Sequence, residues 1–162
     1  MKREESVVLP DGRILRHGNT ERIVHWSIAI AFLFLFFSGL ALFSPFFFWL
    51  SALFGGGQFM RLLHPFAGVL LVLLFYPYAW RLRKDNRWTP VDAKWVENAV
   101  AYMEKRAESG ETGKYNAGQK LMYWSMVPII AILFLTGITM WQPWFANSFP
   151  ASLRRVTSLL HA

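Results

Sequence analysis

The chain of 162 residues has the length of one domain, a net charge of +7 and no cysteine. Hydrophobic residues make up 54% of it and charged residues only 17%, which is typical of proteins whose solvent is lipid and argues against disorder and nucleic-acid binding. Without cysteine, these residues cannot form disulfides, cysteine-ligated zinc sites, iron–sulfur clusters or covalent c-type haem.

Three long uncharged stretches predict membrane-spanning helices. They cover residues 23–43, 62–80 and 121–141, and at about 1.5 Å per residue each can cross a hydrocarbon core of about 30 Å. The first is longer than the apolar part of a signal peptide, and no small-residue cleavage site follows it. None has the short alternating pattern of an outer-membrane barrel, so helices are expected.

The basic residues between these stretches predict the orientation of the chain. Five of the seventeen Lys and Arg lie in residues 1–22 and nine in residues 81–120, whereas residues 44–61 hold one and the residues after Trp141 hold two. In membrane proteins the cytoplasmic loops carry the excess of Lys and Arg. We therefore expect a multi-pass protein of the bacterial cytoplasmic (inner) membrane with a cytoplasmic N-terminus.

The long basic connection predicts a surface helix over residues 90–108. Thr89 can cap this helix, Pro90 suits its first position, and Asp92 is a favourable acid in its first turn. Apolar residues then recur at helical spacing, at Val91, Trp95, Ala99, Tyr102 and Met103. Such an amphipathic helix is expected to lie on the cytoplasmic surface of the membrane.

A fourth span is predicted to start at about residue 153, because an apolar run begins at Val156. The sequence ends at Ala162, too early for this run to cross, so we expect a fragment of a longer chain. The expected fold is one all-α integral membrane domain over residues 1–162. It is a four-helix transmembrane bundle with the fourth helix truncated at about 153–162, plus the cytoplasmic interfacial helix.

The four histidines lie at depths that decide what each can do. His17 is expected to be a solvated or interfacial side chain. His25 enters the first span near the inner face and His64 begins the second span at the outer face, so one metal cannot bind both. His161 would reach the depth of His64, and these two could hold one haem between them. A partner for His25 would stand fourteen residues beyond His161 on the same helix face.

These residues also allow other interpretations. Histidines inside a membrane can be hydrogen-bonded core residues or can line a proton path. Gly39 lies on the same helix face as His25, and Gly68 lies one turn beyond His64, where a small residue would let a porphyrin approach the backbone. Close packing between helices explains such glycines equally well.

Four segments, taken together, carry a family resemblance. They are His25-Trp26, Leu63-His64-Pro65-Phe66, Gly113-Lys114-Tyr115-Asn116-Ala117-Gly118-Gln119-Lys120 and Leu160-His161-Ala162. In this order and spacing they resemble the cytochrome b (gamma) subunit of membrane-bound respiratory formate dehydrogenases. The eight-residue stretch before the third span is the most specific of the four.

The resemblance implies two b-type haems, one near each face of the membrane. His64 and His161 match the axial ligands of the outer haem, and His25 matches one ligand of the inner haem. Asn116, Gly118 and Gln119 match the pocket for menaquinone or ubiquinone beside the inner haem; without the resemblance, this segment would be interpreted as a simple turn in solvent.

The implied function is electron transfer and not catalysis on formate. A catalytic molybdenum or tungsten (alpha) subunit and an iron–sulfur (beta) subunit would deliver electrons to the outer haem, and quinone would be reduced at the inner face. One alternative is the cytochrome b subunit of a membrane-bound hydrogenase or of another molybdenum oxidoreductase. A haem-free membrane anchor or small transporter is the other, although the inverted repeats of many transporters are not visible.

Overall fold

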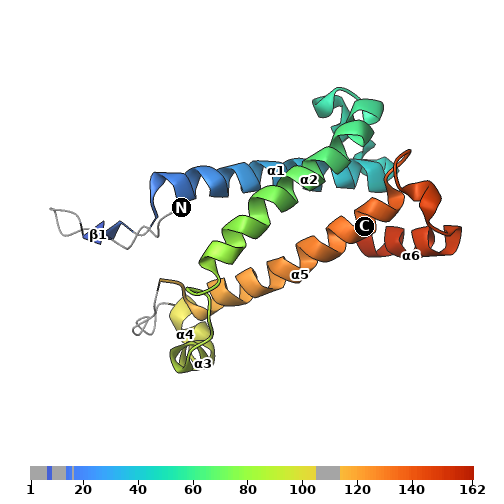
Figure 1. The fold of residues 1–162 in the computed structure, drawn as a ribbon. Coiled ribbons are helices and arrows are strands. Elements are labelled where there is room, and N and C mark those ends of the chain that lie inside the picture. Colours follow the sequence, from blue (N-terminus) through green and yellow to red (C-terminus); the bar gives the residue numbers. More distant parts are fainter. Residues whose placement is uncertain (1–6, 9–13, 16, 105–113) are drawn as a thin grey trace. The chain divides into compact units, whose positions relative to one another are not determined.

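A computed structural model describes residues 7–8, 14–15, 17–104 and 114–162 of the chain. Three long helices dominate it, α1 (Asn19–Phe43), α2 (Gly57–Leu82) and α5 (Ala117–Met140) (Figure 1). Two strands of two residues each, β1 (Val7–Val8) and β2 (Ile14–Leu15), pair antiparallel before α1. The shorter elements are η1 (Pro45–Phe54), α3 (Pro90–Glu97), α4 (Ala99–Met103), η2 (Ala146–Ser148) and α6 (Ala151–His161).

The three long helices are long and apolar enough to cross a membrane. With 24 to 26 residues each, they extend over roughly 36–39 Å, more than a hydrocarbon core requires. Only 11–17% of their most apolar stretches is buried within the described structure. The three predicted spans are therefore confirmed as helices. The eleven residues of α6 begin where the fourth span was predicted, but α6 is not among the helices that are long enough to cross.

The chain divides into two compact units. One contains residues 1–18 and 77–128, and the other contains residues 19–76 and 129–162. The helices α2 and α5 run through both units, and each passes from one to the other at a proline, Pro77 in α2 and Pro128 in α5. A proline inside a helix removes one backbone donor, so both transitions fall where the helical hydrogen bonding is interrupted.

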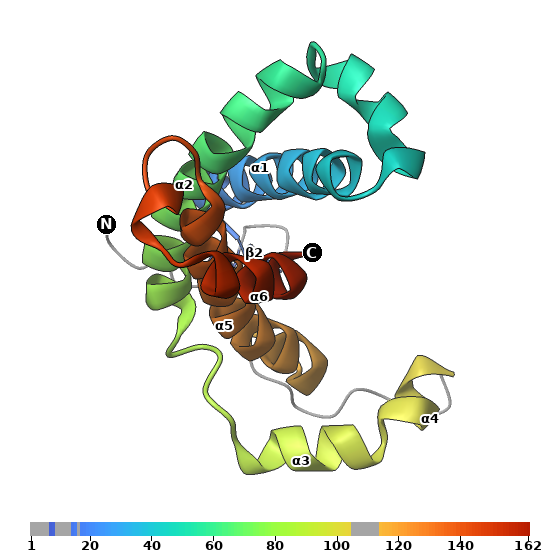
Figure 2. The ribbon, with the colours of Figure 1, turned by 90° about the vertical axis from the view of Figure 1, so that its right-hand side faces the viewer.

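In the unit of residues 19–76 and 129–162, a 3-10 helix that the sequence did not predict turns the chain from α1 into α2. This helix, η1, packs against the end of α1, where Ala41, Leu50 and Met60 form a small buried core (Figure 2). Gly55 follows it with φ of 80°, a left-handed conformation that residues with a side chain rarely adopt. The first connection is thus an ordered structure rather than a loop.

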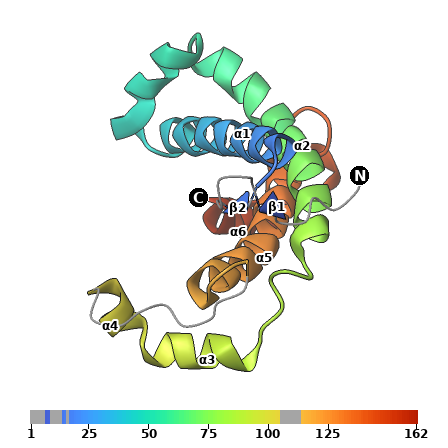
Figure 3. The same ribbon diagram turned by 90° about the vertical axis from the view of Figure 1, so that its left-hand side faces the viewer.

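In the unit of residues 1–18 and 77–128, the predicted surface helix is two short helices instead of one. The ribbon shows α3 and α4 as separate helices (Figure 3), and the break falls at Asn98. The backbone N–H and the side-chain Nδ2 of Asn98 both donate to the carbonyl of Lys94, at 3.3 and 3.0 Å. Asn98 has φ of −101° and ψ of 8°, which departs from helical values and ends α3. The prediction of one continuous helix over 90–108 is therefore wrong at Asn98, and residues 105–108 lie outside the described residues.

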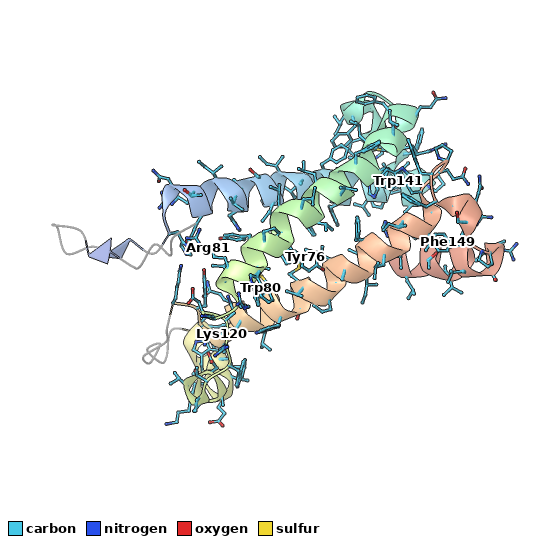
Figure 4. All side chains as sticks on the ribbon, viewed as in Figure 1. Tyr76, Trp80, Arg81, Lys120, Trp141 and Phe149 are labelled. Carbon is cyan, nitrogen blue, oxygen red and sulfur yellow. The ribbon has the colours of Figure 1, made fainter. Side chains whose placement is uncertain are left out.

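The start of α3 is joined to the first turn of α5 by a buried ion pair. Lys120 Nζ lies 2.8 Å from Asp92 Oδ2, and both side chains are about 5% exposed or less (Figure 4 labels Lys120). The same carboxylate accepts hydrogen bonds from the backbone N–H and the hydroxyl of Thr89, both at 2.7 Å. Asp92 therefore caps its own helix and neutralises a lysine of another helix at once.

These contacts lower the pKa of the Asp92 carboxyl. Burial favours the neutral acid, but the hydrogen bonds from Lys120 and Thr89 outweigh burial and hold the pKa of the Asp92 carboxyl below its ordinary value of 3.8. Because the pKa is lower in the folded protein, the carboxylate stabilises the fold fully above the ordinary value. That contribution is lost as the pH falls through the lowered pKa.

Replacing Asp92 by Asn is expected to destabilise the protein at pH 7 by about 3–5 kcal/mol, because Lys120 is left buried without a counter-charge. Thermal unfolding in detergent, followed by circular dichroism, measures the effect. The difference from the original protein should shrink in acid, below the ordinary pKa of aspartate. Glu97→Gln, an exposed change in the same helix, is the control and should have little effect. Equal stability of Asp92→Asn and the original protein at pH 7 would contradict the role given to this pair.

Candidate functional site

Two of the four histidines lie next to each other. The ring of His64, on α2, and the ring of His161, at the end of α6, have centroids 6.1 Å apart and planes inclined by 68°. Both belong to the unit of residues 19–76 and 129–162. The structure thus brings together the two residues that were expected to share one haem, while their role as iron ligands stays a prediction.

A buried serine of α1 holds the His64 ring. Ser38 Oγ lies 2.7 Å from His64 Nδ1 and 3.2 Å from the carbonyl oxygen of Leu35. The single proton of the Ser38 hydroxyl can go to the Leu35 carbonyl or to Nδ1. If a metal bound Nε2, Nδ1 would carry the ring proton and donate it to Ser38, and the Ser38 proton would go to the helix backbone.

A threonine of α5 holds the His161 ring in the same way. Thr136 Oγ1 lies 3.0 Å from His161 Nδ1, and its own proton can go to the carbonyl of Ile132 at 2.7 Å or of Leu133 at 3.0 Å. If a metal bound Nε2 of His161, Nδ1 would likewise donate to the Thr136 hydroxyl.

A second pair of hydroxyls fixes α6 against α5. Thr139 Oγ1 and Thr157 Oγ1 are 2.6 Å apart in a buried contact. Thr139 lies three residues after Thr136 on α5, and Thr157 lies four residues before His161 on α6. The contact between Thr139 and Thr157 is therefore about one helical turn away from the contact between Thr136 and His161. It sets the rotation of α6 that carries His161 to Thr136 (Figure 1 shows α6 beside the end of α5).

Glycines stand beside both imidazole rings. A Cβ atom at Gly39 would lie 3.6 Å from His64 Cε1, and one at Gly137 would lie only 3.0 Å from His161 Cε1. The sequence singled out Gly39 for haem packing, and the structure places it against a histidine ring. Around Gly68, the other predicted haem-packing residue, nothing lies within 4 Å of the position of a Cβ.

Sequence reasoning missed Ser38, Thr136 and Gly137, although the chain carries a signal for them. A hydroxyl residue followed by glycine occurs in α1 as Ser38-Gly39 and in α5 as Thr136-Gly137. Seven residues after each hydroxyl comes a proline, then a 3-10 helix, and then Leu-Leu-His. The corresponding residues are Pro45, η1 and Leu62-Leu63-His64 in the first case and Pro143, η2 and Leu159-Leu160-His161 in the second. The same order of residues therefore occurs twice in the chain, and each occurrence supplies one histidine of the pair.

Aromatic side chains flank the end of α5 in this unit. The Trp141 ring lies 5.2 Å from Phe66 and 5.7 Å from Phe145, in edge-to-face contacts (Figure 4 labels Trp141). Phe66 follows His64 by two residues on α2. These contacts join the beginning of α2 to the segment between α5 and α6, and so support the two helices that carry the histidines.

The other two histidines contact aromatic rings of other residues. His25 is exposed on α1 and contacts the Trp26 ring at 6.2 Å between centroids. In the part of the chain that the structure describes, no other histidine ring contacts it. His17 was expected to be a solvated or interfacial side chain; its ring is partly buried and lies 6.1 Å from the Tyr115 ring.

The three residues assigned to quinone form the start of α5. The Asn116 backbone N–H donates to Gln119 Oε1 at 3.0 Å, and the Gln119 backbone N–H donates to Asn116 Oδ1 at 2.9 Å. This reciprocal pair is a capping box. A Cβ at Gly118 would lie 3.2 Å from the Trp95 ring, so this glycine allows α3 to pack closely. Among the described residues, no protein acceptor binds the side-chain NH2 group of Asn116 or of Gln119.

Comparison with known proteins gives relatives over most of the chain. The chain is 36% identical over 151 residues to the cytochrome b556(Fdn) subunit of the nitrate-inducible formate dehydrogenase of Escherichia coli, covering 92% of this chain and 69% of that protein. It is 34% identical over 153 residues to the cytochrome b556 subunit of formate dehydrogenase of Haemophilus influenzae, covering 94% of this chain. The b556(fdo) subunit of Escherichia coli is 34% identical over 166 residues, covering 100% of this chain and 73% of that protein.

The chain spans 64% of the length of the Haemophilus relative. The model of one protein family, prokaryotic cytochrome b561, matches residues 16–162, which is nearly all of the chain. This family implies haem b as the cofactor, and together with the three apolar helices it identifies an integral membrane protein. The chain belongs to the prokaryotic cytochrome b561 family.

Proposed function

We propose that this chain is the membrane cytochrome b subunit of a formate dehydrogenase and carries electrons through b haems to quinone. The observation that carries the proposal is the pair of facing histidines, His64 and His161, whose Nδ1 atoms are both bound to hydroxyls. The names of the relatives, at 34–36% identity, support a formate dehydrogenase over a hydrogenase as the complex.

The residues present fit an iron held between two imidazoles. A neutral imidazole can bind a metal through one ring nitrogen, and a b-type haem can be held by two histidines. The His64 and His161 rings, with centres 6.1 Å apart, would hold the iron. Gly39 and Gly137 leave room for these rings, since a Cβ there would lie 3.6 and 3.0 Å from a ring carbon. A bound haem b supplies a one-electron carrier, while the protein orients it and adjusts its potential.

The rest of the chain fits an inner-membrane subunit whose N-terminus is cytoplasmic. We assign His25 as one ligand of a second, inner haem, Gly68 to haem packing, and α6 to the beginning of a fourth helix of the bundle, all in one domain of residues 1–162. The short helices α3 and α4 expose the apolar side chains of Val91, Val96, Val100 and Met103. Such side chains suit helices lying in the cytoplasmic membrane interface.

The partners follow from the same assignment. An iron–sulfur (beta) subunit would deliver electrons on the outer side, and it would receive them from a catalytic molybdenum or tungsten (alpha) subunit that oxidises formate. We assign no step on formate itself to this chain, and its own task is to bind, orient and insulate the electron carriers.

Quinone is assigned to the first turn of α5. The carbonyl oxygens of menaquinone or ubiquinone are acceptors, so they need donors from the protein. The side-chain oxygens of Asn116 and Gln119 accept hydrogen bonds in the capping box. Their two NH2 groups would therefore donate to the quinone oxygens. Gly118 keeps this turn close to Trp95, whose ring can form an apolar wall for the quinone.

The haem assignment predicts which histidines are needed. In the purified complex, His64→Ala or His161→Ala should remove one b haem per chain, His25→Ala should remove the other, and His17→Gln should remove none. The pyridine haemochrome spectrum counts the haem, and the reduced-minus-oxidised spectrum identifies it as b-type. Full haem content after both His64→Ala and His161→Ala would rule out the pair as ligands.

The quinone assignment predicts an effect of removing donors without removing the cap. Asn116→Asp and Gln119→Glu keep the oxygens that cap α5 but lose the NH2 groups, so formate-driven quinone reduction should fall by roughly tenfold for each lost hydrogen bond. Haem content and haem reduction by formate should not change. Gln58→Glu, which adds a carboxylate at an exposed position of α2, is the matched control. Unchanged quinone reduction in both variants would show that these residues only cap the helix.

A further inference from the structure

We infer that the hydroxyls of Ser38 and Thr136 are positioning groups that set the reduction potential of the haem between His64 and His161. The inference rests on the proposed function, because it requires both histidines to be iron ligands. It goes beyond that function by assigning a task to two residues that would not contact the iron themselves.

Iron bound at Nε2 of a neutral imidazole leaves the ring proton on Nδ1, so each histidine would donate from Nδ1 to its hydroxyl. Each hydroxyl has a backbone acceptor for its own proton, the Leu35 carbonyl for Ser38 and the Ile132 or Leu133 carbonyl for Thr136. An imidazole that donates from Nδ1 becomes a more basic ligand at Nε2, and a more basic ligand favours ferric over ferrous iron.

The hydroxyls do not need the histidines for their own hydrogen bonding. Ser27 and Ser125 also sit in long apolar helices and bond the carbonyl four residues earlier, at 2.9 and 2.8 Å, with no histidine beside them in the described residues. The backbone bond alone satisfies such a donor. The contact with Nδ1 is therefore an additional one, and it serves the histidine, whose N–H would be costly to leave unpaired in this environment.

The hydrogen bonds of the two hydroxyls to their histidines differ in length and burial. Ser38 is 0% exposed, and its bond to Nδ1 is the shorter, at 2.7 Å. Thr136 is 7% exposed, and its bond to His161 Nδ1 is longer, at 3.0 Å. Removing the hydroxyl should therefore affect the haem more at Ser38 than at Thr136.

The test is a potentiometric titration of the purified holo-complex, with the two haems resolved by their spectra. Ser38→Ala should raise the potential of one haem, by roughly tenfold in its ferric–ferrous equilibrium, which is about 59 mV for a one-electron couple. Thr136→Val should raise the same potential less, and Thr136→Ser, which keeps the hydroxyl, should restore the original value. The other haem should not change in any of them.

Ser125→Ala is the matched control, since it removes a hydroxyl that has the same backbone bond but no histidine partner, and it should leave both potentials unchanged. Original potentials in fully loaded Ser38→Ala and Thr136→Val would overturn the inference and leave the proposed function standing. If Ser38→Ala fails to load haem, the comparison of Thr136→Val with Thr136→Ser decides. Full haem content in His64→Ala and His161→Ala would instead overturn the proposed function, and with it this inference.

Discussion

A polar group inside an apolar environment must find a partner within the protein, and this requirement shapes the site. The N–H of an imidazole costs several kcal/mol if it is left unpaired in hydrocarbon. His64 and His161 meet the requirement through Ser38 and Thr136. In both cases a hydroxyl of a neighbouring helix is bound to the same ring nitrogen, Nδ1.

Buried polar groups also need partners within the protein where α5 begins. Lys120 is buried and needs a counter-charge, and Asp92 supplies it while capping α3. The first turn of α5 has backbone N–H groups without helical partners, and Asn116 and Gln119 bind two of them. Residues that resemble a quinone site therefore also have a structural task. Substitutions that keep the capping oxygens are needed to separate the two tasks.

In the unit of residues 19–76 and 129–162, two segments with the same order of residues form the two halves of the histidine site. A hydroxyl and a glycine on one helix, a proline and a 3-10 helix, and a histidine on the next helix recur in the same order. In the first case the hydroxyl and the histidine are 26 residues apart, and in the second they are 25 apart. Two similar segments thus present two imidazoles to each other, an arrangement suited to a cofactor with two axial positions.

The sequence by itself predicted the three long apolar helices, the proximity of His64 and His161, and the resemblance to cytochrome b subunits. These depend on local properties, namely the length of an uncharged run and the number of residues between landmarks. It did not determine η1, the break of the surface helix at Asn98, or the hydroxyl partners of the histidines. Only the tertiary structure decided those, because a contact between residues 26 apart depends on the rotation of each helix about its axis. The end of α3 likewise depends on the backbone conformation of one residue, Asn98, which composition and spacing do not determine.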